Sequence, residues 1–197
     1  MGALSVALLA DSYIIAEHHQ IVGRGHADTL MPAVAAVMDG QAPPAAIVVD
    51  IGPGSFTGLR IGIAAARALG LAWDVPVTGC TSTALIAAAA FEHDVTATQL
   101  MVVLDAGRGQ LYTQRIAVDL QPLGEIVAAT PAEVLAALAP ASVLAGPGAR
   151  LLPVEHGHRV VDGSEPRAAS ARLLVPARRA LAPAPIYLRA PDAKVAA

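Results

Sequence analysis

The sequence has few of the residues that mark secreted or nucleic-acid-binding proteins. Its single cysteine, Cys80, excludes a disulfide within the chain and suits a reducing compartment, so we expect a cytoplasmic protein. Only 15% of the 197 residues are charged, the formal net charge is −3, and no run of lysine or arginine occurs. The sequence therefore indicates no extended basic surface for nucleic acid. Cys80 lies in an apolar stretch, which favours a buried thiol over a nucleophile.

Long uninterrupted apolar runs are also missing. Arg67 and Asp74 interrupt the longest candidate, so no stretch is long enough to span a bilayer and we expect no contact with a membrane. Residues 1–10 are apolar without a positively charged leader, which favours a β-strand over a signal peptide. What the chain has instead is 55% hydrophobic residues, ample for one large or two small globular domains.

The most informative segment runs from Ile51 to Ala72. Here Gly-Pro-Gly at 52–54 follows the apolar run 45–49, which predicts a strand that ends in a sharp turn. Ser55 or Thr57 can then cap a helix. Small residues recur at every fourth position of that helix, at Gly58, Gly62, Ala66 and Gly70. This spacing gathers them on one face and allows another backbone to approach closely.

Two catalytic interpretations of this segment fail. A phosphate-binding P-loop needs lysine and then serine or threonine after its last glycine, but Gly58 is followed by Leu59 and Arg60. A nucleophile elbow needs glycine two residues to either side of its serine, whereas Ser55 is flanked at those positions by proline and threonine. Two interpretations stay open: the glycines serve packing within the chain, or they meet a ligand or partner.

Apolar periodicity predicts two similar halves in which strands alternate with helices. In the first half we expect a hairpin over 5–16, helices over 28–39, 56–73 and 82–91, and strands over 45–49 and 75–77. In the second half we expect a hairpin over 100–118, a helix over 131–138, a strand over 142–145 and a helix over 168–181 that Pro176 interrupts. This order predicts an α/β fold with mixed sheets flanked by helices, in two halves over residues 1–98 and 99–197.

Four short motifs stand out along the chain. They are Gly-Arg-Gly-His-Ala-Asp at 23–28, Gly-Pro-Gly-Ser-Phe-Thr-Gly-Leu-Arg-Ile-Gly at 52–62, Val-Leu-Asp-Ala-Gly-Arg-Gly-Gln-Leu-Tyr at 103–112 and Ile-Tyr-Leu-Arg at 186–189. In order and spacing they resemble the TsaB family, also called YeaZ. The resemblance covers nearly the whole chain and implies an actin-like ATPase fold whose two lobes are each related to ribonuclease H.

The resemblance also implies a function. In that family TsaB is a catalytically inactive relative of TsaD, the enzyme that transfers a threonylcarbamoyl group to an adenosine beside the tRNA anticodon, and TsaB is its scaffold. We therefore expect a non-catalytic subunit that binds and activates a TsaD-type transferase, alongside a TsaE-type ATPase. Contact with tRNA would be indirect, and the chain alone would form a homodimer. The alternative is a stand-alone weak ATPase or a glycopeptidase-like enzyme of the same superfamily.

The family contact is a helical bundle, which the resemblance maps onto residues 26–38 and 56–73. The partner-binding residues expected from it are His26, Leu30, Val34, Met38, Gly58, Leu59, Gly62, Ile63 and Ala66. The spacing leaves two faces open for the second helix. Either Gly58 and Gly62 meet the partner, or they face this chain's own sheet and the contact passes to Leu59, Ile63 and Arg67.

No catalytic or metal site is predicted. TsaD-like enzymes hold a metal with two histidines three residues apart, and no histidine here has a partner at that spacing. His156 and His158 lie in a predicted loop and are expected to be solvated. Asp50 and Asp105 end strands, where either can meet a nucleotide or magnesium or simply cap a turn. We expect no cofactor to be required by this chain, with any ATP or ADP bound at the partner interface.

Two features depart from the family pattern. Asp50 stands where the family usually has glycine, and Ile51 replaces a residue that is usually polar. Family members also begin with a strand ending in Asp-Thr before the segment that matches Ala3 to Leu9. That strand should be central in the first sheet, and leaving it out would expose two rows of backbone hydrogen-bonding groups. We therefore expect a misplaced start or a shortened chain rather than a natural variant.

Overall fold

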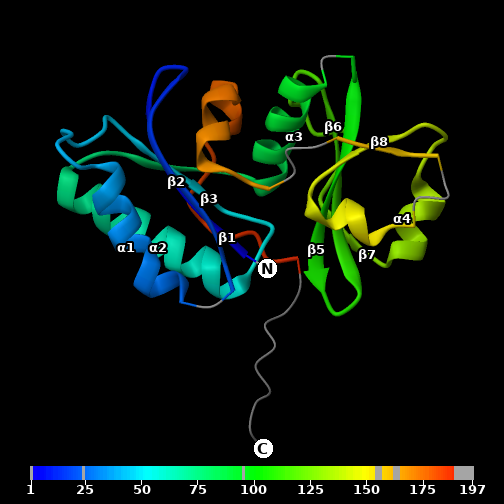
Figure 1. Ribbon diagram of the computed structural model, residues 1–197, viewed down its shortest axis with the longest axis horizontal. Helices are drawn as coiled ribbons and strands as arrows, with labels where there is room; N and C mark the ends of the chain where they lie inside the picture. Colours follow the sequence, from blue (N-terminus) through cyan, green and yellow to red (C-terminus); the bar gives the residue numbers. More distant parts are fainter. Residues whose placement is uncertain (1, 24, 95, 154–156, 162–164, 189–197) are drawn as a thin grey trace, which may run out of the picture.

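The computed structural model describes residues 2–23, 25–94, 96–153, 157–161 and 165–188. Their helices and strands form two lobes, with α1 and α2 at the outer side of one and β5 to β8 in the other (Figure 1). Arg24, His156 and Arg189, which belong to predicted motifs or sites, lie outside the described residues.

The first lobe contains two separate two-stranded sheets. One is an antiparallel hairpin and the other a parallel pair. Its elements are β1 (Gly2–Ala10), β2 (Tyr13–Val22), α1 (His26–Val37), β3 (Ile47–Asp50), α2 (Phe56–Trp73), β4 (Val77–Cys80) and α3 (Ser82–His93). The hairpin, the strand before the glycine turn and the three helices are confirmed. The hairpin strands are longer than their apolar cores, because pairing continues along polar residues such as Glu17 and His19.

The second lobe has one continuous five-stranded sheet in the order β7-β6-β5-β8-β9. Its elements are β5 (Gln99–Gly107), β6 (Gln110–Ala117), β7 (Val127–Ala129), α4 (Pro131–Ala137), β8 (Val143–Ala145), η1 (Pro147–Leu151) and β9 (Arg159–Val160). Strand β5 is central, antiparallel to β6 and parallel to β8. The short strands β7 and β9 were not predicted, because two or three residues carry no periodicity.

The end of the described chain returns to the first lobe. The α-helix predicted over 168–181 is wrong, since two short 3₁₀ segments stand there, η3 (Ala168–Leu173) and η4 (Pro176–Arg178), although they are divided next to Pro176, where an interruption was expected. Proline cannot donate a backbone hydrogen bond, so Pro176 starts a new turn instead of extending the old one. Segment η3 packs on β1, β2 and α3, and Leu181 exchanges backbone hydrogen bonds with Gly79 of β4. The predicted division near residue 98 stays a prediction.

Side-chain caps explain where the helices begin. The Ser55 hydroxyl accepts a hydrogen bond from the backbone N–H of Gly58 at the start of α2, as one of the two predicted caps. Thr81 caps α3 in the same way through the N–H of Ala84. Thr130 and Glu133 form a reciprocal capping box at α4, so three helix starts follow from local sequence.

Helix α3 is the centre of the core. All of its residues from Ser82 to Phe91 are buried, and Ile86 and Ala87 are 0% exposed. It packs against β5, β6 and β8 on one side and η3 on the other, so it joins the lobes. Its buried Thr83 donates a 2.6 Å hydrogen bond to Gln114 of β6, which satisfies the polar atoms that the core encloses.

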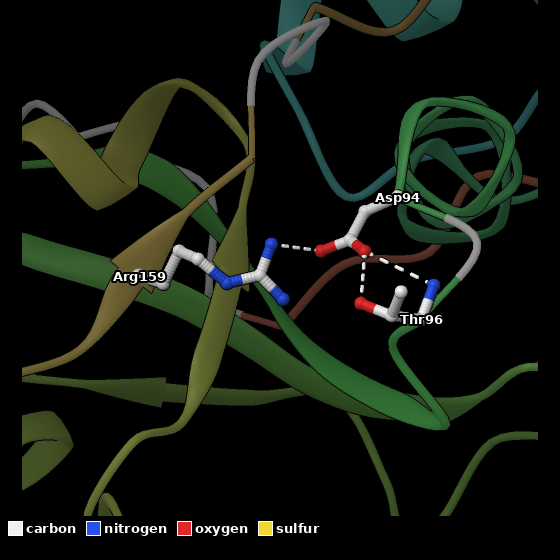
Figure 2. Close-up of polar contacts among 3 residues, drawn as sticks. All are labelled: Asp94, Thr96 and Arg159. Atoms are coloured by element: carbon white, nitrogen blue, oxygen red, sulfur yellow. Dashed lines mark hydrogen bonds and ion pairs between the residues drawn. The ribbon is translucent and has the colours of Figure 1, made fainter.

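An ion pair ties the end of α3 to the edge of the second sheet. Asp94, just after α3, receives the Arg159 guanidinium of β9 and two hydrogen bonds from Thr96 (Figure 2). The Thr96 hydroxyl is 2.7 Å from the carboxylate. Hydrogen bonds from Thr96, together with the Arg159 charge, lower the pKa of Asp94 from its ordinary value.

Candidate partner-binding surface

Helices α1 and α2 lie side by side on the outer side of the first lobe (Figure 1). Helix α1 covers β1 and β2, while α2 covers β3 and β4. Gly25 precedes α1 with φ +89°, a conformation that favours glycine. The two helices therefore form one layer with an inner face on the strands and an outer face towards solvent.

The predicted partner-binding residues of α2 lie on the inner face. Leu59, Ile63 and Ala66 are only 8%, 4% and 6% exposed. A Cβ added at Gly62 would lie 3.9 Å from Val49 of β3, so this glycine also faces the chain's own sheet. Gly58 is half-buried beside the capping Ser55. Of the two alternatives left open by the spacing, the glycine face is turned inward, and so are Leu59 and Ile63 of the other face, while its third residue, Arg67, is exposed.

The predicted residues of α1 are half-buried. Leu30, Val34 and Met38 line a cavity between the helices and the strands. His26 is the first residue of α1, and a Cβ added at Gly2 of β1 would lie 3.0 Å from its Nε2. The structure therefore brings the predicted residues together, but around the inner side of the helix layer.

The outer helix face carries a different set of residues. Its exposed members are Ala27, Met31 and Ala35 on α1 and Ala64, Ala68, Leu71 and Ala72 on α2. On α1 they are spaced four residues apart. On α2, Ala64 and Ala68 are four apart, and Leu71 and Ala72 lie three and four residues beyond Ala68, so each set lies along one face of its helix. Leu71 is 87% exposed and Met31 48% exposed. Small side chains allow another helix to approach closely, and the alanine spacing was the signal that sequence analysis passed over.

An aromatic and guanidinium cluster borders this face at the start of α2. The Arg60 guanidinium lies 3.8 Å from the centre of the Phe56 ring, and its Nε donates a 2.9 Å hydrogen bond to the Tyr187 hydroxyl. About two turns further on, Arg67 donates to the Pro183 carbonyl. These contacts hold residues 183–187 against α2, so two of its exposed cations are already engaged within the chain.

The two acids at strand ends have structural roles. The Asp105 carboxylate accepts the backbone N–H of Gly107 at 2.7 Å and so caps the β5–β6 turn. Asp50 accepts the backbone N–H of Gly52 and the Ser82 hydroxyl, both at 2.8 Å. Asp50 is half-buried and lines the same cavity as Leu30 and Val34. Burial raises the pKa of this carboxyl, and the two hydrogen bonds only partly oppose that rise.

Catalytic and metal-binding groups do not gather at these positions. Cys80 is buried, and its burial, followed by the nearby Asp50 charge, raises the pKa of its thiol. A thiol held in that state is a poor nucleophile, as predicted from its apolar surroundings. Within the described ranges, no three His, Cys, Asp or Glu side chains are grouped closely enough to hold a metal ion. None of the described helices is both long and apolar enough to cross a membrane.

Comparison with known proteins identifies the family. Residues 14–158 match the family model described as "TsaD: tRNA N6-adenosine threonylcarbamoyltransferase". An uncharacterized protein of Mycobacterium tuberculosis is 35% identical over 191 residues, covering 93% of this chain and 84% of that protein. A Bacillus subtilis protein named "tRNA threonylcarbamoyladenosine biosynthesis protein TsaB" is 36% identical over 114 residues. The chain belongs to the TsaB family. The match covers 56% of this TsaB-family chain and 48% of the B. subtilis protein, about half its length.

Solved structures support the same assignment. YeaZ from Pseudomonas aeruginosa superimposes with a TM-score of 0.75 at 25% identity, covering 94% of each chain. A second Pseudomonas aeruginosa structure, described as an uncharacterized protein with similarity to peptidase YEAZ, gives a TM-score of 0.74 at 29% identity. It covers 95% of this chain and 94% of that one. The two lobes of this TsaB-family chain therefore have the actin-like ATPase fold, which confirms the predicted fold class.

Proposed function

We propose that this chain is a non-catalytic subunit in threonylcarbamoyladenosine formation on tRNA, and that it binds and activates a TsaD-type transferase. Its similarity to proteins named for that biosynthesis supports the pathway. The observation that supports this mode of binding is the outer helix face, where exposed apolar and mostly small side chains lie along α1 and α2. Such a face suits a helical bundle with a partner.

The contact we propose uses the outer face directly. Leu59, Ile63 and Ala66, expected from the resemblance to touch the partner, are buried within this chain and would support α2 from beneath. Ala64 and Ala68 would lie against the partner helix, with Met31 and Leu71 supplying apolar area on either side. We extend the proposal to a homodimer through the same face when the transferase is absent.

A pair of matched arginine variants tests this proposal. Ala68 lies on the outer face of α2, and Ala136 is another exposed helical alanine, on α4 of the other lobe. We expect Ala68→Arg to abolish the complex with the TsaD-type transferase from the same organism, measured by light scattering after size exclusion. Ala136→Arg should bind like the parent chain. Equal binding by both variants would contradict the proposed face.

Activity measurements separate the scaffold from the alternative enzyme. A scaffold has no turnover alone and raises threonylcarbamoyl transfer to tRNA by the transferase. A weak ATPase or glycopeptidase-like enzyme would hydrolyse ATP or peptide without a partner. Adding a TsaE-type ATPase tests the accompanying proposal that this ATPase joins the complex. Repeating the measurement with and without ATP or ADP tests whether nucleotide binds at the interface rather than to this chain alone.

A further inference from the structure

An arginine stands at the start of the outer face of α2. Exposed residues follow one another along this face at intervals of four, at Phe56, Arg60, Ala64 and Ala68. This spacing places the Arg60 side chain on the same face as the two alanines, one turn closer to the beginning of the helix. A cation therefore borders the surface to which we assign the partner helix.

Two aromatic rings fix the orientation of the Arg60 guanidinium. Its Cζ lies 3.8 Å from the centre of the Phe56 ring and 5.6 Å from the centre of the Tyr187 ring. The two rings also contact each other, with their centres 5.1 Å apart. A long side chain that is free on a surface loses rotamer freedom when it binds, but stacking already restricts this one. Its hydrogen-bond donors are thus held in place before any partner arrives.

The backbone before Tyr187 keeps that ring in position. Leu181 exchanges two backbone hydrogen bonds with Gly79 of β4, and the N–H of Ile186 donates to the Ile51 carbonyl at 2.8 Å. Between these points the Pro183 carbonyl accepts the hydrogen bond from Arg67 already described. Residues 181–187 are therefore attached to the first lobe at three places, and Tyr187 is a fixed support for Arg60.

The terminal nitrogens of Arg60 have donors to spare. A guanidinium has five N–H donors, and within the described part of the chain Arg60 uses only Nε, which bonds to the Tyr187 hydroxyl. None of the ion pairs formed by described acidic residues includes Arg60. Helix α2 itself has no Asp or Glu between Phe56 and Trp73. This end of the outer face therefore carries a positive charge without a negative counterpart, with both terminal nitrogens available.

We propose that Arg60 binds the carboxylate of an aspartate or glutamate on the partner, through two parallel hydrogen bonds from its terminal nitrogens. Paired hydrogen bonds of this kind fix position as well as adding binding energy. The carboxylate would lie beside Ala64, so it would set how the partner helix is aligned along α2. This inference rests on the proposed function, since it names one polar contact of the same surface.

The surroundings of Arg60 favour a carboxylate over a phosphate. One planar guanidinium matches the two oxygens and the single charge of a carboxylate. The other cation of α2, Arg67, already donates to a backbone carbonyl. The formal net charge of the chain is −3 and no run of lysine or arginine occurs, so the sequence does not indicate the broad positive surface that a nucleic-acid backbone requires.

Conservative variants at Arg60 test this contact. The parent chain and each variant are bound to the TsaD-type transferase from the same organism, and association and dissociation rates are measured by surface plasmon resonance at several salt concentrations. Arg60→Lys keeps the charge but loses the planar pair of donors, so we expect the dissociation constant to rise at least about tenfold. Arg60→Met also removes the charge, which should make the association rate less dependent on salt.

Two further variants complete the set. Arg150 is an exposed arginine of η1 in the other lobe, so Arg150→Lys is the matched control and should bind like the parent. Tyr187→Phe removes only the hydroxyl that accepts from Nε, and we expect it to weaken binding roughly threefold. Thermal unfolding of each variant alone checks that it is folded. If the Arg60 variants do not fold, the parent chain decides, because an association rate that salt leaves unchanged would overturn the proposal.

The outcomes separate this inference from the proposed function. Failure of the parent chain to bind the transferase would overturn both. If Arg60→Lys and Arg60→Met bind as tightly as the parent, only the contact at Arg60 is overturned. Weaker binding by Arg60→Met with unchanged salt dependence would also overturn it, since Arg60 would then act through packing alone. So would release of the transferase by inorganic phosphate beyond the effect of chloride at equal ionic strength, because Arg60 would then bind phosphate instead.

Discussion

The strands of the first lobe form two separate sheets, whereas those of the second form one. In the second, β5 joins hairpin and parallel strands into one sheet, and Val102 and Leu144 are 0% exposed. In the first, all four residues of β3 are half-buried although helices cover them. The difference shows that a central strand does more than add its own hydrogen bonds. It also closes the space between its neighbours, and without it their side chains border a cavity.

The largest expected difference in stability between the lobes concerns the glycine turns that follow β3 and β8. At Gly146 an added Cβ would lie 2.3 Å from the Val103 carbonyl oxygen, which is backbone and cannot move aside easily. At Gly52 the nearest atom is a Leu59 methyl at 2.9 Å, which can rotate. Both positions have positive φ, so both variants are strained. We expect Gly146→Ala to cost roughly 4 kcal/mol and Gly52→Ala roughly 2 kcal/mol, measured by urea unfolding. Equal costs would mean that the two turns are equally confined.

The next largest difference is expected from side-chain packing in the strands of the two lobes. Leu144 of β8 is fully buried, whereas Leu8 of β1 is half-buried and borders the cavity. We expect Leu144→Ala to lower the free energy of unfolding by about 3 kcal/mol, because it removes contacts in a close-packed sheet. Leu8→Ala should cost about 1 kcal/mol, since its side chain has fewer neighbours to lose. A similar cost at both sites in the same urea titrations would show that the first lobe is as tightly packed as the second.

The smallest effect concerns Asp50, which stands two residues before its turn glycine, as Leu144 does in the other lobe. Burial raises the pKa of the folded-state carboxyl above the ordinary 3.8. The stabilising protonated form is thus fully present below that value, and its contribution is lost as pH rises through the folded pKa. Asp50→Asn keeps an acceptor for Gly52 and Ser82 without the charge. We expect it to be more stable than the parent at pH 8, by about 1 kcal/mol, and equal to it near pH 3.

Thermal unfolding followed across pH checks this prediction. A variant less stable than the parent at every pH would show that the second carboxylate oxygen, which also accepts from Ser82 at 2.7 Å, matters more than the buried charge. Ser82→Ala serves as the matched control, because it removes the hydroxyl while leaving the carboxylate in place. It should lower stability most at high pH, where Asp50 is ionised.

Much of the fold was predictable because its signals are local. The Gly-Pro-Gly turn at 52–54, the Ser55 cap and the hairpins all depend on residues close together in the chain. The helix over 168–181 was predicted wrongly because tertiary contacts of η3 with β1 and α3 compensate for weak local structure. For the candidate surface, the sequence indicated α1 and α2 but not their orientation, since Gly62 and Ile63 fit either an inner or an outer face.

By itself, the sequence determined the family, the α/β alternation and the elements that form the helix layer, because spacing, caps and turn residues act over a few positions. Tertiary structure decided which face of that layer is free. Gly62 and Leu59 turn inward because β3 and the cavity lie beneath α2, and the alanines at 64 and 68 are left outside. It also decided that β1 and β3 remain apart, since pairing between strands distant in sequence depends on what lies between them in space.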